Sequence, residues 1–454
     1  MKNKKIVVCL KYFKGELNPF DGAALECALE MGAKDITAVT MSPPSAKPTF
    51  QALTRLGVKC LFISDSAYAG SDTQATSYIL SEAIKRLNPD LVFCGRQSVD
   101  GDTAQVPPML AQRMGYAIQT KVMAFDGEKI TLRSGESFVP QDKTVITFEK
   151  IRTLRFPSIF SKIGEVETWD NGILQLPIEK CGFKGSPTRV VKSYESTVGR
   201  RDCQFFSVEK LHELIENALK KPRIAQAQEA GKKLKKAYFV GGVKSIAESI
   251  AMEAIELEIE NKTPEEIARE VTGKTVLWED SERLKVFASQ TAVLCGAGLC
   301  ADCISFRVEN ERLIMTRPAL GGNITADIVC ESDTTFATVR TVKNDGAEVI
   351  FSVGKGAIDQ IEEIKEFAKK YNAEVCCSRI VADSGKLPYE KQVGLTGRTV
   401  SPKVYVAFGV SGAVQHTCAI AGANTVIAVN TNKQARIFDY ADFGIITEVK
   451  NVKL

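Results

Sequence analysis

Short apolar runs alternate with amphipathic stretches through most of the chain. In the first third, the runs KIVVCLK, DITAVTM, CLFISD and LVFCG (residues 5–11, 35–41, 60–65 and 91–95) predict buried strands. The stretches between them, such as DGAALECALEMG and TSYILSEAIKRLN, carry apolar residues at helical spacing and predict helices. Strands and helices that alternate in this way are typical of a parallel α/β sheet covered by helices.

The middle of the chain changes character before this alternation returns. The stretch FSVEKLHELIENALKK predicts an amphipathic helix, in which His212 is expected to pack or to face the surface. The polar, basic run AQAQEAGKKLKK predicts an exposed helix or a linker. We therefore expect a first α/β domain over 1–205, a helical linker over 206–236, a shorter α/β domain over 237–343 and a C-terminal α/β domain over 344–454.

The segment 404–432 contains no charged residue, although it holds His416, one of only two histidines. Its length alone would suit a membrane span, but Ser411, Gln415 and Asn424 interrupt it with polar groups. We instead expect a buried strand VYVAFGV, a turn, a helix GAVQHTCAIAG and a second buried strand NTVIAVN. Such a βαβ unit predicts two parallel strands joined by a right-handed crossover.

Composition and charge narrow the class of protein. The chain has 454 residues, of which 44% are hydrophobic and 25% charged, as in globular proteins of two or three domains. A net charge of +4 is small for this length, and no recognised binding motif accompanies it, so we expect no nucleic-acid partner. The N-terminal apolar run is too short for an export signal, which predicts a cytoplasmic protein with reduced cysteines and no membrane span.

One cysteine spacing suggests a metal cluster. The sequence CGAGLCADC places Cys295, Cys300 and Cys303 as in part of a plant-type iron–sulfur pattern. No fourth cysteine follows at a convincing position, and Gly and Ala dominate between the three. We therefore expect small buried residues in a tight turn, and no metal.

Two loops follow predicted parallel strands at the edge where such sheets bind ligands. In VFCGRQSVDGDTAQVPP, a strand ends at Cys94, and a loop with Gly95, Gly101 and two aspartates leads into a helix. Backbone amides at that helix start could hold a phosphate. The same residue types also serve ordinary turn geometry, so this loop alone leaves both interpretations open.

The second loop region combines SRIVADSGKLPYEKQVGLTGRT with GVSGAVQH. Gly409 and Gly412 would let a ligand approach the backbone, and a helix from about Ser411 would supply unpaired N–H groups and positive partial charge. A lone histidine such as His416 is more often a hydrogen-bonded core residue. Arg379 follows two cysteines at a strand end, however, and an arginine and a histidine that converge on one turn favour an anion-binding site.

These motifs resemble the electron transfer flavoprotein family. SR, QVGLTGRTVSPKVYVAFGVSGAVQH, VIAVN and ADFGI resemble the FAD-binding domain of its alpha subunit, and TRPALGGNI and ATVR resemble that subunit's first domain. LNPFD, ISDSAYAGSDTQATS, CGRQSVDGDTAQV and GFKGSPTRVVK resemble its beta subunit. The resemblance implies a single-chain fusion that is a monomer mimicking the alpha–beta heterodimer. It also implies two three-layer parallel-sheet domains of the adenine nucleotide hydrolase-like type, followed by a Rossmann-like FAD-binding domain.

The resemblance implies a set of FAD-binding residues in the C-terminal domain. Three of them would tune the flavin: His416 near N1 and the C2 carbonyl, Arg379 over the isoalloxazine and Thr396 near N5. A positive helix end and a histidine would there stabilise negative charge on the reduced flavin and raise its potential. The full implied set is Lys355, Ser378, Arg379, Gln392, Val393, Gly394, Leu395, Thr396, Gly397, Ser411, Gly412, Ala413, Val414, Gln415, His416 and Asn430.

The resemblance implies a second nucleotide site in the beta-like part. Family members hold AMP or a second FAD there, and GRQSVDGDTAQV resembles the electron-bifurcating members, which hold FAD and oxidise NADH. The loop between Cys9 and Asn18 is shorter than in the family and Pro107 replaces a glycine, which leaves AMP open. The implied residues are Cys9, Asn18, Pro19, Phe20, Asp21, Ser64, Asp100, Gly101, Asp102, Thr103, Ala104, Gln105 and Val106.

Two further departures concern the FAD domain. Lys355 stands where the family has arginine, which keeps the charge but loses bidentate geometry, and Glu448 stands where it has aspartate. Neither change removes the expectation of FAD binding. The segment 237–275 matches the family poorly, so the alpha-like first domain is expected to be short at its start.

The resemblance implies an electron carrier between NADH or a dehydrogenase and a partner flavoenzyme such as an acyl-CoA dehydrogenase, with ferredoxin or flavodoxin as a further acceptor. Two alternatives stay open: an AMP-containing one-electron carrier without NADH oxidation, and a degenerate nucleotide-binding regulatory or scaffold protein. RTLRFPSIFSKI resembles the family's dehydrogenase-recognition loop, with Ile159 as the apolar anchor and Arg152, Arg155 and Lys162 as a basic rim. The alternative is that Ile159 packs into the domain core.

Overall fold

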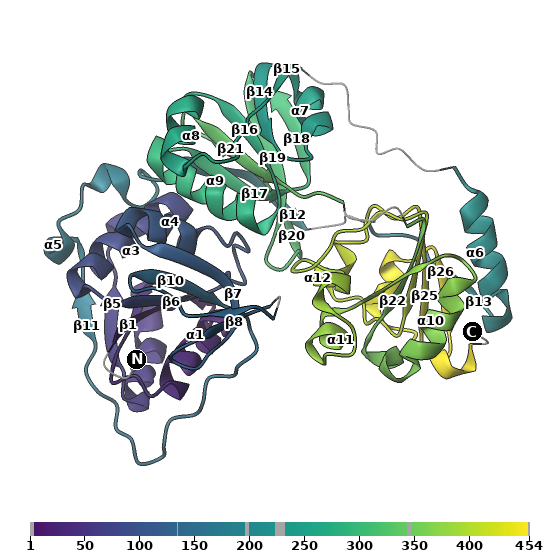
Figure 1. Cartoon of the computed structure of the whole chain (residues 1–454), viewed down its shortest axis with the longest axis horizontal. Coiled ribbons are helices and arrows are strands. Elements are labelled where there is room, and N and C mark those ends of the chain that lie inside the picture. Colours follow the sequence, from purple (N-terminus) through teal and green to yellow (C-terminus); the bar gives the residue numbers. More distant parts are fainter. Residues whose placement is uncertain (1–3, 134, 196–198, 223–231, 343–346, 453–454) are drawn as a thin grey trace. The chain divides into compact units, whose positions relative to one another are not determined.

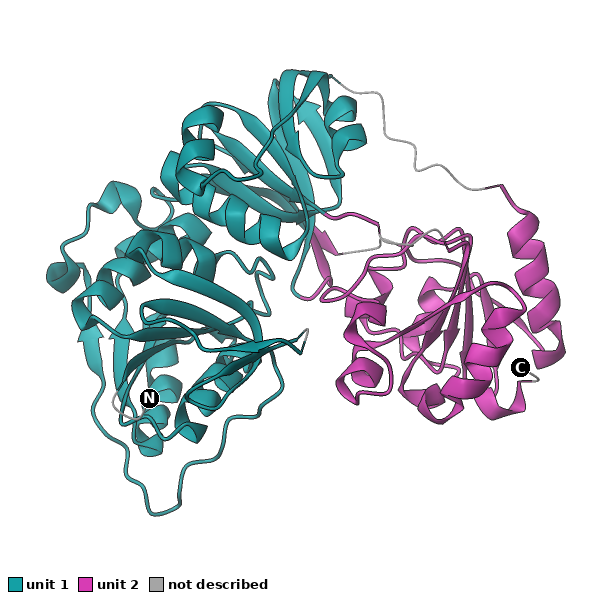
Figure 2. Cartoon of the chain, viewed as in Figure 1, with its two compact units in different colours: residues 1–193, 231–320, 326–339 teal, residues 194–230, 321–325, 340–454 magenta. Residues whose placement is uncertain are grey.

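The computed structural model of the chain describes residues 4–133, 135–195, 199–222, 232–342 and 347–452. The chain divides into two compact units, coloured separately in Figure 2. The first unit contains 1–193, 231–320 and 326–339, and the C-terminal unit contains 194–230, 321–325 and 340–454. Both consist of helices and largely parallel sheets, which confirms the expected α/β class. No helix within the described ranges has the length and apolar character that crossing a membrane requires.

The first lobe of the first unit is a nine-stranded sheet in the order β11-β5-β4-β1-β6-β10-β7-β8-β9 (Figure 1). All the neighbours from β11 to β7 pair in parallel. The strands of the sheet are β1 (Lys5–Cys9), β4 (Asp35–Met41), β5 (Lys59–Ile63), β6 (Leu91–Gly95), β7 (Ala117–Phe125), β8 (Ile130–Leu132), β9 (Ser137–Phe138), β10 (Thr144–Phe148) and β11 (Glu167–Trp169). A separate antiparallel pair consists of β2 (Tyr12–Phe13) and β3 (Glu16–Leu17). The helices are α1 (Pro19–Glu30), α2 (Lys47–Gln51), α3 (Thr73–Leu87), α4 (Val106–Met114) and α5 (Asn171–Leu174).

The second lobe contains a five-stranded parallel sheet in the order β15-β14-β16-β21-β17 and a four-stranded sheet in the order β12-β20-β19-β18. The two lobes are joined by buried hydrogen bonds, since Gln74 donates to the carbonyls of Ala292 and Ala297. The elements are β12 (Thr188–Glu195), β14 (Leu234–Val240), β15 (Ala251–Glu256), β16 (Thr275–Glu279), β17 (Gly298–Cys303), β18 (Ser305–Glu309), β19 (Arg312–Ala319), β20 (Ile324–Cys330), β21 (Thr335–Val339), α7 (Lys244–Ile250), α8 (Pro264–Val271) and α9 (Glu282–Cys295).

The C-terminal unit is a six-stranded parallel sheet in the order β13-β26-β25-β24-β22-β23. The two strands predicted from the uncharged segment are present as β24 and β25, and they pair in parallel as expected. The elements are β13 (Gln204–Phe206), β22 (Val349–Val353), β23 (Glu374–Cys377), β24 (Val404–Phe408), β25 (Thr425–Asn430), β26 (Phe443–Ile446), α6 (Leu211–Lys220), α10 (Ile361–Lys369), α11 (Arg379–Asp383) and α12 (Val414–Thr417).

The helix predicted between β24 and β25 is much shorter than expected. Only the single turn α12 is α-helical, whereas the sequence pattern predicted a helix from about Ser411 to Gly422. The residues that follow form three-residue turns, in which Ala423 donates to the Ile420 carbonyl. The Ala419 carbonyl, which a continuing helix would need, instead accepts the amide of Val400. Pairing with another segment therefore ends the helix early, and the expected contribution of a helix dipole is lost.

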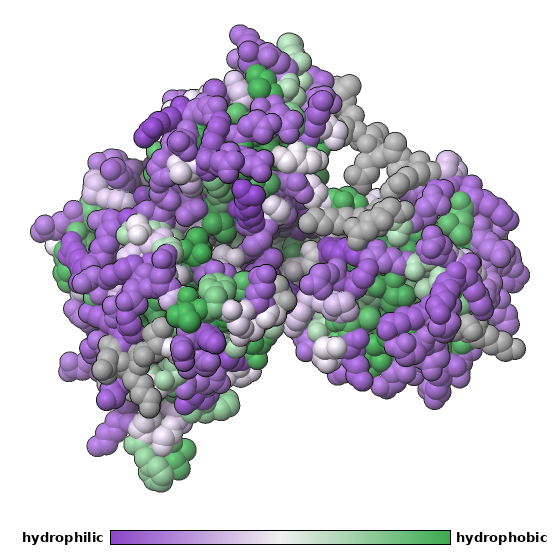
Figure 3. Space-filling view, in the orientation of Figure 1, coloured by the Kyte–Doolittle hydropathy of each residue, from purple (hydrophilic) through white to green (hydrophobic). Residues whose placement is uncertain are grey.

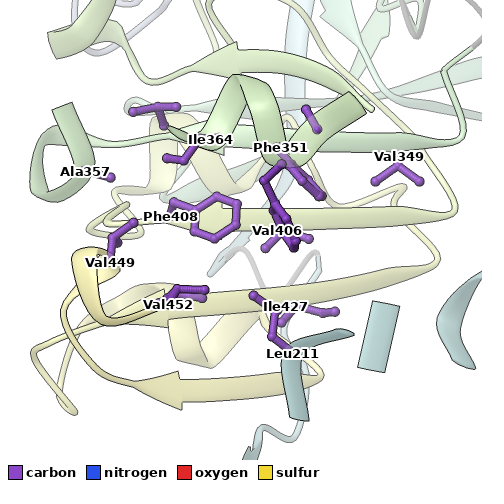
Figure 4. Close-up of a cluster of buried hydrophobic side chains, with 14 of the residues drawn as sticks. Leu211, Val349, Phe351, Ala357, Ile364, Val406, Phe408, Ile427, Val449 and Val452 are labelled. Atoms are coloured by element: carbon purple, nitrogen blue, oxygen red, sulfur yellow. The ribbon is translucent and has the colours of Figure 1, made fainter. Parts of the chain in front are cut away.

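Helix α6 belongs to the core of the C-terminal unit. Its side chains Leu211, Leu214, Ile215 and Ala218 are buried together with residues of the sheet, and Figure 4 shows Leu211 beside Ile427. The segment 206–236 was expected to be a helical linker, yet its first part packs into this unit, and residues 223–231 lie outside the described residues. The expected boundary at residue 205 likewise differs from the boundary between the compact units, because β13 pairs with β26.

We predict that Ile215→Ala lowers the unfolding free energy of the C-terminal unit by about 2–5 kcal/mol, because Ile215 is completely buried. Asn217→Ala, on the exposed face of the same helix, should change it by less than about 0.5 kcal/mol. Urea unfolding followed by hydrogen exchange of peptides from β22 to β25 measures both. Equal effects of the two variants would show that α6 is only a linker.

Candidate functional site

The chain changes direction in the C-terminal sheet between β22 and β24. It leaves β22 towards β23 on one side and then returns to place β24 and β25 on the other. Loops that diverge at such a switch point form the usual ligand crevice of an open parallel sheet. The segments after β22, β23 and β24 carry the residues that the sequence predicted for FAD, and Asn430 is the last residue of β25. The segment Gln392–Gly397, between β23 and β24, is tied to the same edge of the sheet.

The glycines at this switch point bring two loops together rather than a loop and a ligand. A Cβ atom on Gly354 would lie 2.2 Å from the Gly409 carbonyl oxygen, and one on Gly412 would lie 2.0 Å from the Ile437 nitrogen. Gly409 and Gly412 also have positive φ angles of 62° and 82°. The expectation that these glycines open the backbone to a ligand is therefore wrong, because other segments of the protein already occupy the space.

The turn that Gly409 and Gly412 shape exposes donors to solvent. Ser411, Ala413 and Gln415 are exposed, whereas Gly412, Val414 and His416 are buried. The backbone N–H groups of 411–415 donate to no acceptor among the described residues. A row of unpaired amides of this kind can hold an anionic or carbonyl group of a ligand.

The loop Gln392–Gly397 lies directly against this turn. The Val393 amide donates to the Cys377 carbonyl at the end of β23, and the Leu395 amide donates to the Gln415 carbonyl at 2.6 Å. Within the loop, the buried Gln392 side chain donates to the Thr396 hydroxyl at 2.9 Å. The structure thus brings Thr396 and the residues around His416 to one place, as the sequence predicted, and it fixes the Thr396 side chain.

An ion pair holds the base of this loop. The Arg398 guanidinium contacts both carboxylate oxygens of Glu374, at 2.5 and 3.2 Å, and Lys391 contacts the same carboxylate at 2.7 Å. The side chains of Arg398 and Glu374 are nearly buried. These cations lower the pKa of the Glu374 carboxyl against the opposing effect of burial. A bidentate pair in such a site fixes orientation as well as distance, so Glu374 orients the loop that carries Thr396.

His416 is a buried, neutral histidine. Its Nε2 atom lies 2.8 Å from the Tyr405 hydroxyl, and its Nδ1 atom has no hydrogen-bond partner among the described residues. Burial lowers the pKa of His416 to about 4, which the Val393 backbone only partly opposes. At neutral pH, His416 therefore contributes a ring dipole and no positive charge. A buried polar atom without a partner is costly, so the unpaired Nδ1 suits a site that a ligand completes.

The remaining predicted residues lie at the rim of this crevice. Arg379 begins α11, its side chain is 30% exposed, and its guanidinium forms an ion pair with Asp383 at 3.2 Å. Ser378 caps the same helix, and Lys355 is exposed after β22. Asn430 is engaged within the protein, because its amide donates to the Val410 carbonyl at 2.8 Å. At this edge of the sheet, the fixed positive charges of Arg379 and Lys355 are thus exposed to solvent at least in part, whereas His416 is buried and neutral.

The first lobe has a switch point of its own between β1 and β6, where the sheet order also reverses. The Asp21 carboxylate accepts hydrogen bonds from the amides of Lys11 and Gly95, at 2.7 and 2.9 Å, and so ties together the ends of both strands. Burial raises the pKa of Asp21 to about 7 against the effect of these donors. A Cβ atom on Gly95 would lie 2.2 Å from the Asp21 carboxylate, which explains the glycine. Asn18, which is almost fully buried, keeps its Oδ1 atom without a partner in the described part of the chain.

The other residues predicted for the second nucleotide site border this crevice or support it. Asp100 forms an ion pair with Lys11 at 2.7 Å and is tied to the second lobe through its carbonyl, which accepts the Leu320 amide. Gln105 is buried and bonds the Leu299 carbonyl and the Thr73 hydroxyl, so its side chain joins the two lobes. The rest follow β1, β5 and β6: Cys9, Pro19, Phe20, Ser64, Gly101, Asp102, Thr103, Ala104 and Val106.

The cysteines are thiols without a metal cluster in the described ranges. All thirteen are free, and no group of potential metal ligands gathers in the described part of the chain. Cys300 and Cys303 are buried as predicted, but they lie in β17, and Cys295 ends α9, so the expected single tight turn does not hold them.

The segment between β10 and β11 projects apolar side chains into solvent. Ile159 is 85% exposed and Phe156 95% exposed, and the hydrophobic tip is visible in Figure 3. This excludes core packing of Ile159. The backbone nearby is held in place, because Arg55 donates to the carbonyls of Ser158 and Ser161.

Two of the three residues of the expected basic rim form ion pairs with helix α1. Arg152 pairs with Glu30 at 2.6 Å, and Arg155 pairs with the buried carboxylate of Glu26 at 2.6 Å. Both guanidinium groups therefore fasten the start of the loop to helix α1. Lys162 alone of the three is exposed without such a pairing in the described structure.

Two functional positions escaped the sequence pattern. Tyr405 looked like one more apolar residue of a buried strand, and its hydroxyl meets His416 only through the tertiary fold. Glu374 begins the short strand β23, and its partner Arg398 lies 24 positions further along the chain. A polar group inside an otherwise apolar strand was the available signal for Tyr405, and a lone acidic residue before two cysteines was the available signal for Glu374.

The fold and its two switch-point crevices are those of nucleotide-binding α/β proteins. Comparison with known families then identifies the group. The profile described as "Electron transfer flavoprotein domain" matches residues 6–137 and 226–366, and "Electron transfer flavoprotein FAD-binding domain" matches 345–421. The chain belongs to the electron transfer flavoprotein family, and the matched FAD-binding domain supports FAD as its cofactor.

Individual relatives match as single subunits. An electron transfer flavoprotein subunit alpha from Thermoanaerobacterium thermosaccharolyticum is 31% identical over 237 residues, 42% of this chain and 72% of the relative. A subunit beta from Clostridium acetobutylicum is 36% identical over 194 residues, 39% of this chain and 74% of the relative. An acryloyl-CoA reductase electron transfer subunit beta from Anaerotignum propionicum is 35% identical over 192 residues, 31% of this chain and 52% of the relative. Matches to both subunit types are consistent with alpha-like and beta-like parts in one chain.

We predict a pH dependence of stability that originates in His416. Because its folded pKa is about 4 and its unfolded pKa about 6.5, the unfolded state binds the proton first as the pH falls. The stabilisation is complete above the unfolded pKa and falls by about 2 kcal/mol on going from pH 7 to pH 5. His416→Gln should lack this part of the pH dependence. Hydrogen exchange of β24 peptides at both pH values, at fixed FAD concentration, tests it, and identical pH dependence in both proteins would contradict it.

Proposed function

We propose that this chain is an electron carrier, in which FAD bound by the C-terminal unit passes electrons between a donor and a partner flavoenzyme such as an acyl-CoA dehydrogenase. The observation that carries this proposal is the unpaired, buried Nδ1 of His416 beside the free amides of 411–415, inside the matched FAD-binding domain. FAD, when bound, supplies reversible electron transfer. The Anaerotignum relative, an acryloyl-CoA reductase electron transfer subunit beta, supports a CoA-linked flavoenzyme as partner.

In this proposal the side chains of the crevice set the redox potential of the cofactor. Arg379 provides a positive charge that does not depend on pH, and Thr396 provides a hydroxyl whose position Gln392 fixes. His416 provides a neutral ring nitrogen from the buried side. Fixed donors and positive charge favour the reduced, more negative form of a cofactor, so together these groups raise its potential.

For the crevice between β1 and β6 we propose a second FAD, with NADH as the electron donor and ferredoxin or flavodoxin as a further acceptor. The buried Asn18 Oδ1 atom without a partner in the described structure supports a ligand at this place. The resemblance of GRQSVDGDTAQV to the electron-bifurcating members supports FAD over AMP. A chain that carries both crevices would act as a monomer in place of two subunits.

The cofactor content of the purified chain tests both sites. We predict two FAD molecules per chain and no AMP after denaturation and chromatography. One FAD with one AMP would support the electron-carrier function but contradict electron bifurcation, and a chain without flavin would refute the electron-carrier function.

Arg379→Ala should keep FAD in the C-terminal unit but lower the midpoint potential of that FAD by roughly 50 mV, equivalent to about 1.2 kcal/mol for one electron. Lys386→Ala, which removes an exposed cation from the same unit, should leave the potential unchanged.

We further propose that Ile159 is the anchor for the partner flavoenzyme. An exposed apolar side chain on a loop whose backbone is fixed can enter a pocket with little loss of conformational freedom. The ion pairs of Arg152 and Arg155 with helix α1 support this role, because they position the loop and leave its tip projecting.

Ile159→Ala should slow electron transfer to an acyl-CoA dehydrogenase at least about tenfold, with unchanged flavin content. Its unfolding free energy should change by less than about 0.5 kcal/mol, since the side chain is exposed. Met252→Ala, at another exposed apolar position in the same unit, is the matched control and should not affect the rate. Stopped-flow mixing measures the transfer, and equal rates for the two variants would exclude Ile159 as the anchor.

A further inference from the structure

The partner of His416 is the phenol of Tyr405, which reaches it from the middle of β24. Tyr405 has no exposed surface and His416 is 6% exposed, and their Oη and Nε2 atoms lie 2.8 Å apart. The two residues are eleven positions apart in the chain and belong to β24 and to the single turn α12. This hydrogen bond leaves only one ring nitrogen of His416, Nδ1, available for another partner.

The chemistry of the pair determines where the proton lies. A neutral imidazole has one N–H and one lone pair, whereas a phenol can donate its single proton or accept. The phenol is the stronger acid and the unprotonated ring nitrogen the stronger base, so the better hydrogen bond runs from Tyr405 to Nε2. The Ser352 hydroxyl lies beside the phenol and acts to lower the pKa of Tyr405, as a donor to the phenol oxygen does, which leaves the Tyr405 proton for Nε2.

We propose that Tyr405 is a positioning residue that fixes His416 as the tautomer with its proton on Nδ1, and thereby makes His416 a hydrogen-bond donor to an acceptor atom of the bound flavin. The proposal rests on the proposed function in one respect, that FAD occupies this crevice. In the opposite tautomer, Nδ1 would present a lone pair to the ligand. A donor stabilises negative charge that develops on the ligand, whereas a lone pair opposes it.

The surroundings keep this pair neutral. The titratable groups that act on it are the thiols of Cys376 and Cys377 on β23, which β22 separates from β24, and burial raises the pKa of both to about 12. Burial also raises the pKa of Tyr405 itself, so the phenol keeps its proton. No charged partner competes for the imidazole within the described contacts of these residues. The tautomer is therefore determined by neutral groups, the Tyr405 hydroxyl at Nε2 and the Val393 backbone, and not by a charge.

The chain itself offers an internal control, because it has only two histidines. His212 also bonds a tyrosine, but through the other ring nitrogen: its Nδ1 atom lies 2.6 Å from the Tyr371 hydroxyl. By the same argument, the proton of His212 should lie on Nε2. The two histidines of one protein should thus show opposite tautomers.

The test is ¹⁵N NMR of the full-length, FAD-loaded chain labelled at histidine, with His212→Gln to assign the signals. At pH 7 we expect a protonated Nδ1 and an unprotonated Nε2 for His416, and the reverse pattern for His212. A His416 proton on Nε2 in the wild-type chain would overturn the proposal. This outcome does not depend on whether the Tyr405 variant folds. Absence of bound FAD would refute the proposed function instead, and the tautomer could still be read from the unloaded chain.

Tyr405→Phe tests the consequence for the flavin. It should shift the His416 signals towards a mixture of tautomers and move the flavin midpoint potential to a more negative value, as His416→Ala should. The double variant should have the potential of His416→Ala alone, because Tyr405 acts through His416. Tyr371→Phe, which removes the matching hydroxyl from His212, should leave the potential unchanged. A Tyr405→Phe protein that binds FAD with wild-type tautomer and potential would overturn the proposal.

Discussion

The close approach of two backbones at the switch point of the C-terminal sheet constrains the rest of this unit. The loop after β22 and the loop after β24 leave the sheet in opposite directions, and they touch at Gly354, Gly356 and Gly409. Any side chain at Gly354 would collide with the Gly409 carbonyl, and the Gly356 amide donates to that same carbonyl at 3.1 Å. This contact fixes the start of the turn that carries His416, and the Gln415 carbonyl of that turn in turn holds the loop of Thr396. The positions of His416 and Thr396 therefore both depend on the contact of Gly354 and Gly356 with Gly409.

Burial limits where unpaired charge is found at this edge of the sheet. The inner side chain, His416, is neutral because burial disfavours its charged form, and it keeps one polar atom for a ligand. Permanent charge lies on the partly exposed Arg379 and on the nearly buried Arg398–Glu374 ion pair at the base of a loop. Buried ions are tolerated when they are paired and hydrogen-bonded, and an unpaired buried cation would cost more than the crevice could recover. The buried charges at this edge of the sheet are thus paired, and the buried unpaired group, His416, is neutral.

In the first unit, a close contact also joins two loops at a switch point of the sheet, but a side chain takes part in it. There a carboxylate, Asp21, binds the amides at the ends of β1 and β6, and Gly95 is required because the Asp21 oxygen occupies the place of its Cβ atom. The proposed docking loop lies on this unit, whereas the residues matched to the FAD-binding domain lie in the other. The relatives carry alpha and beta parts as separately named subunits, and one chain here carries both kinds of sequence. Covalent connection keeps the two parts at a fixed ratio and a high effective concentration.

The sequence by itself determined the α/β class, the strands of both switch points and the loops that border them, because strand burial and helical periodicity are local patterns that a chain displays directly. It also located His416, Thr396 and Arg379 through motifs. Only the tertiary structure decided what those residues contact. The helix expected after Ser411 shortens to one turn because Val400, a residue of another segment, takes the Ala419 carbonyl. His416 is neutral because the fold buries it, and Tyr405 occupies its Nε2 atom. Protonation state, hydrogen-bond partner and the end of a helix depend on atoms brought together from far apart in the chain, and no local pattern records them.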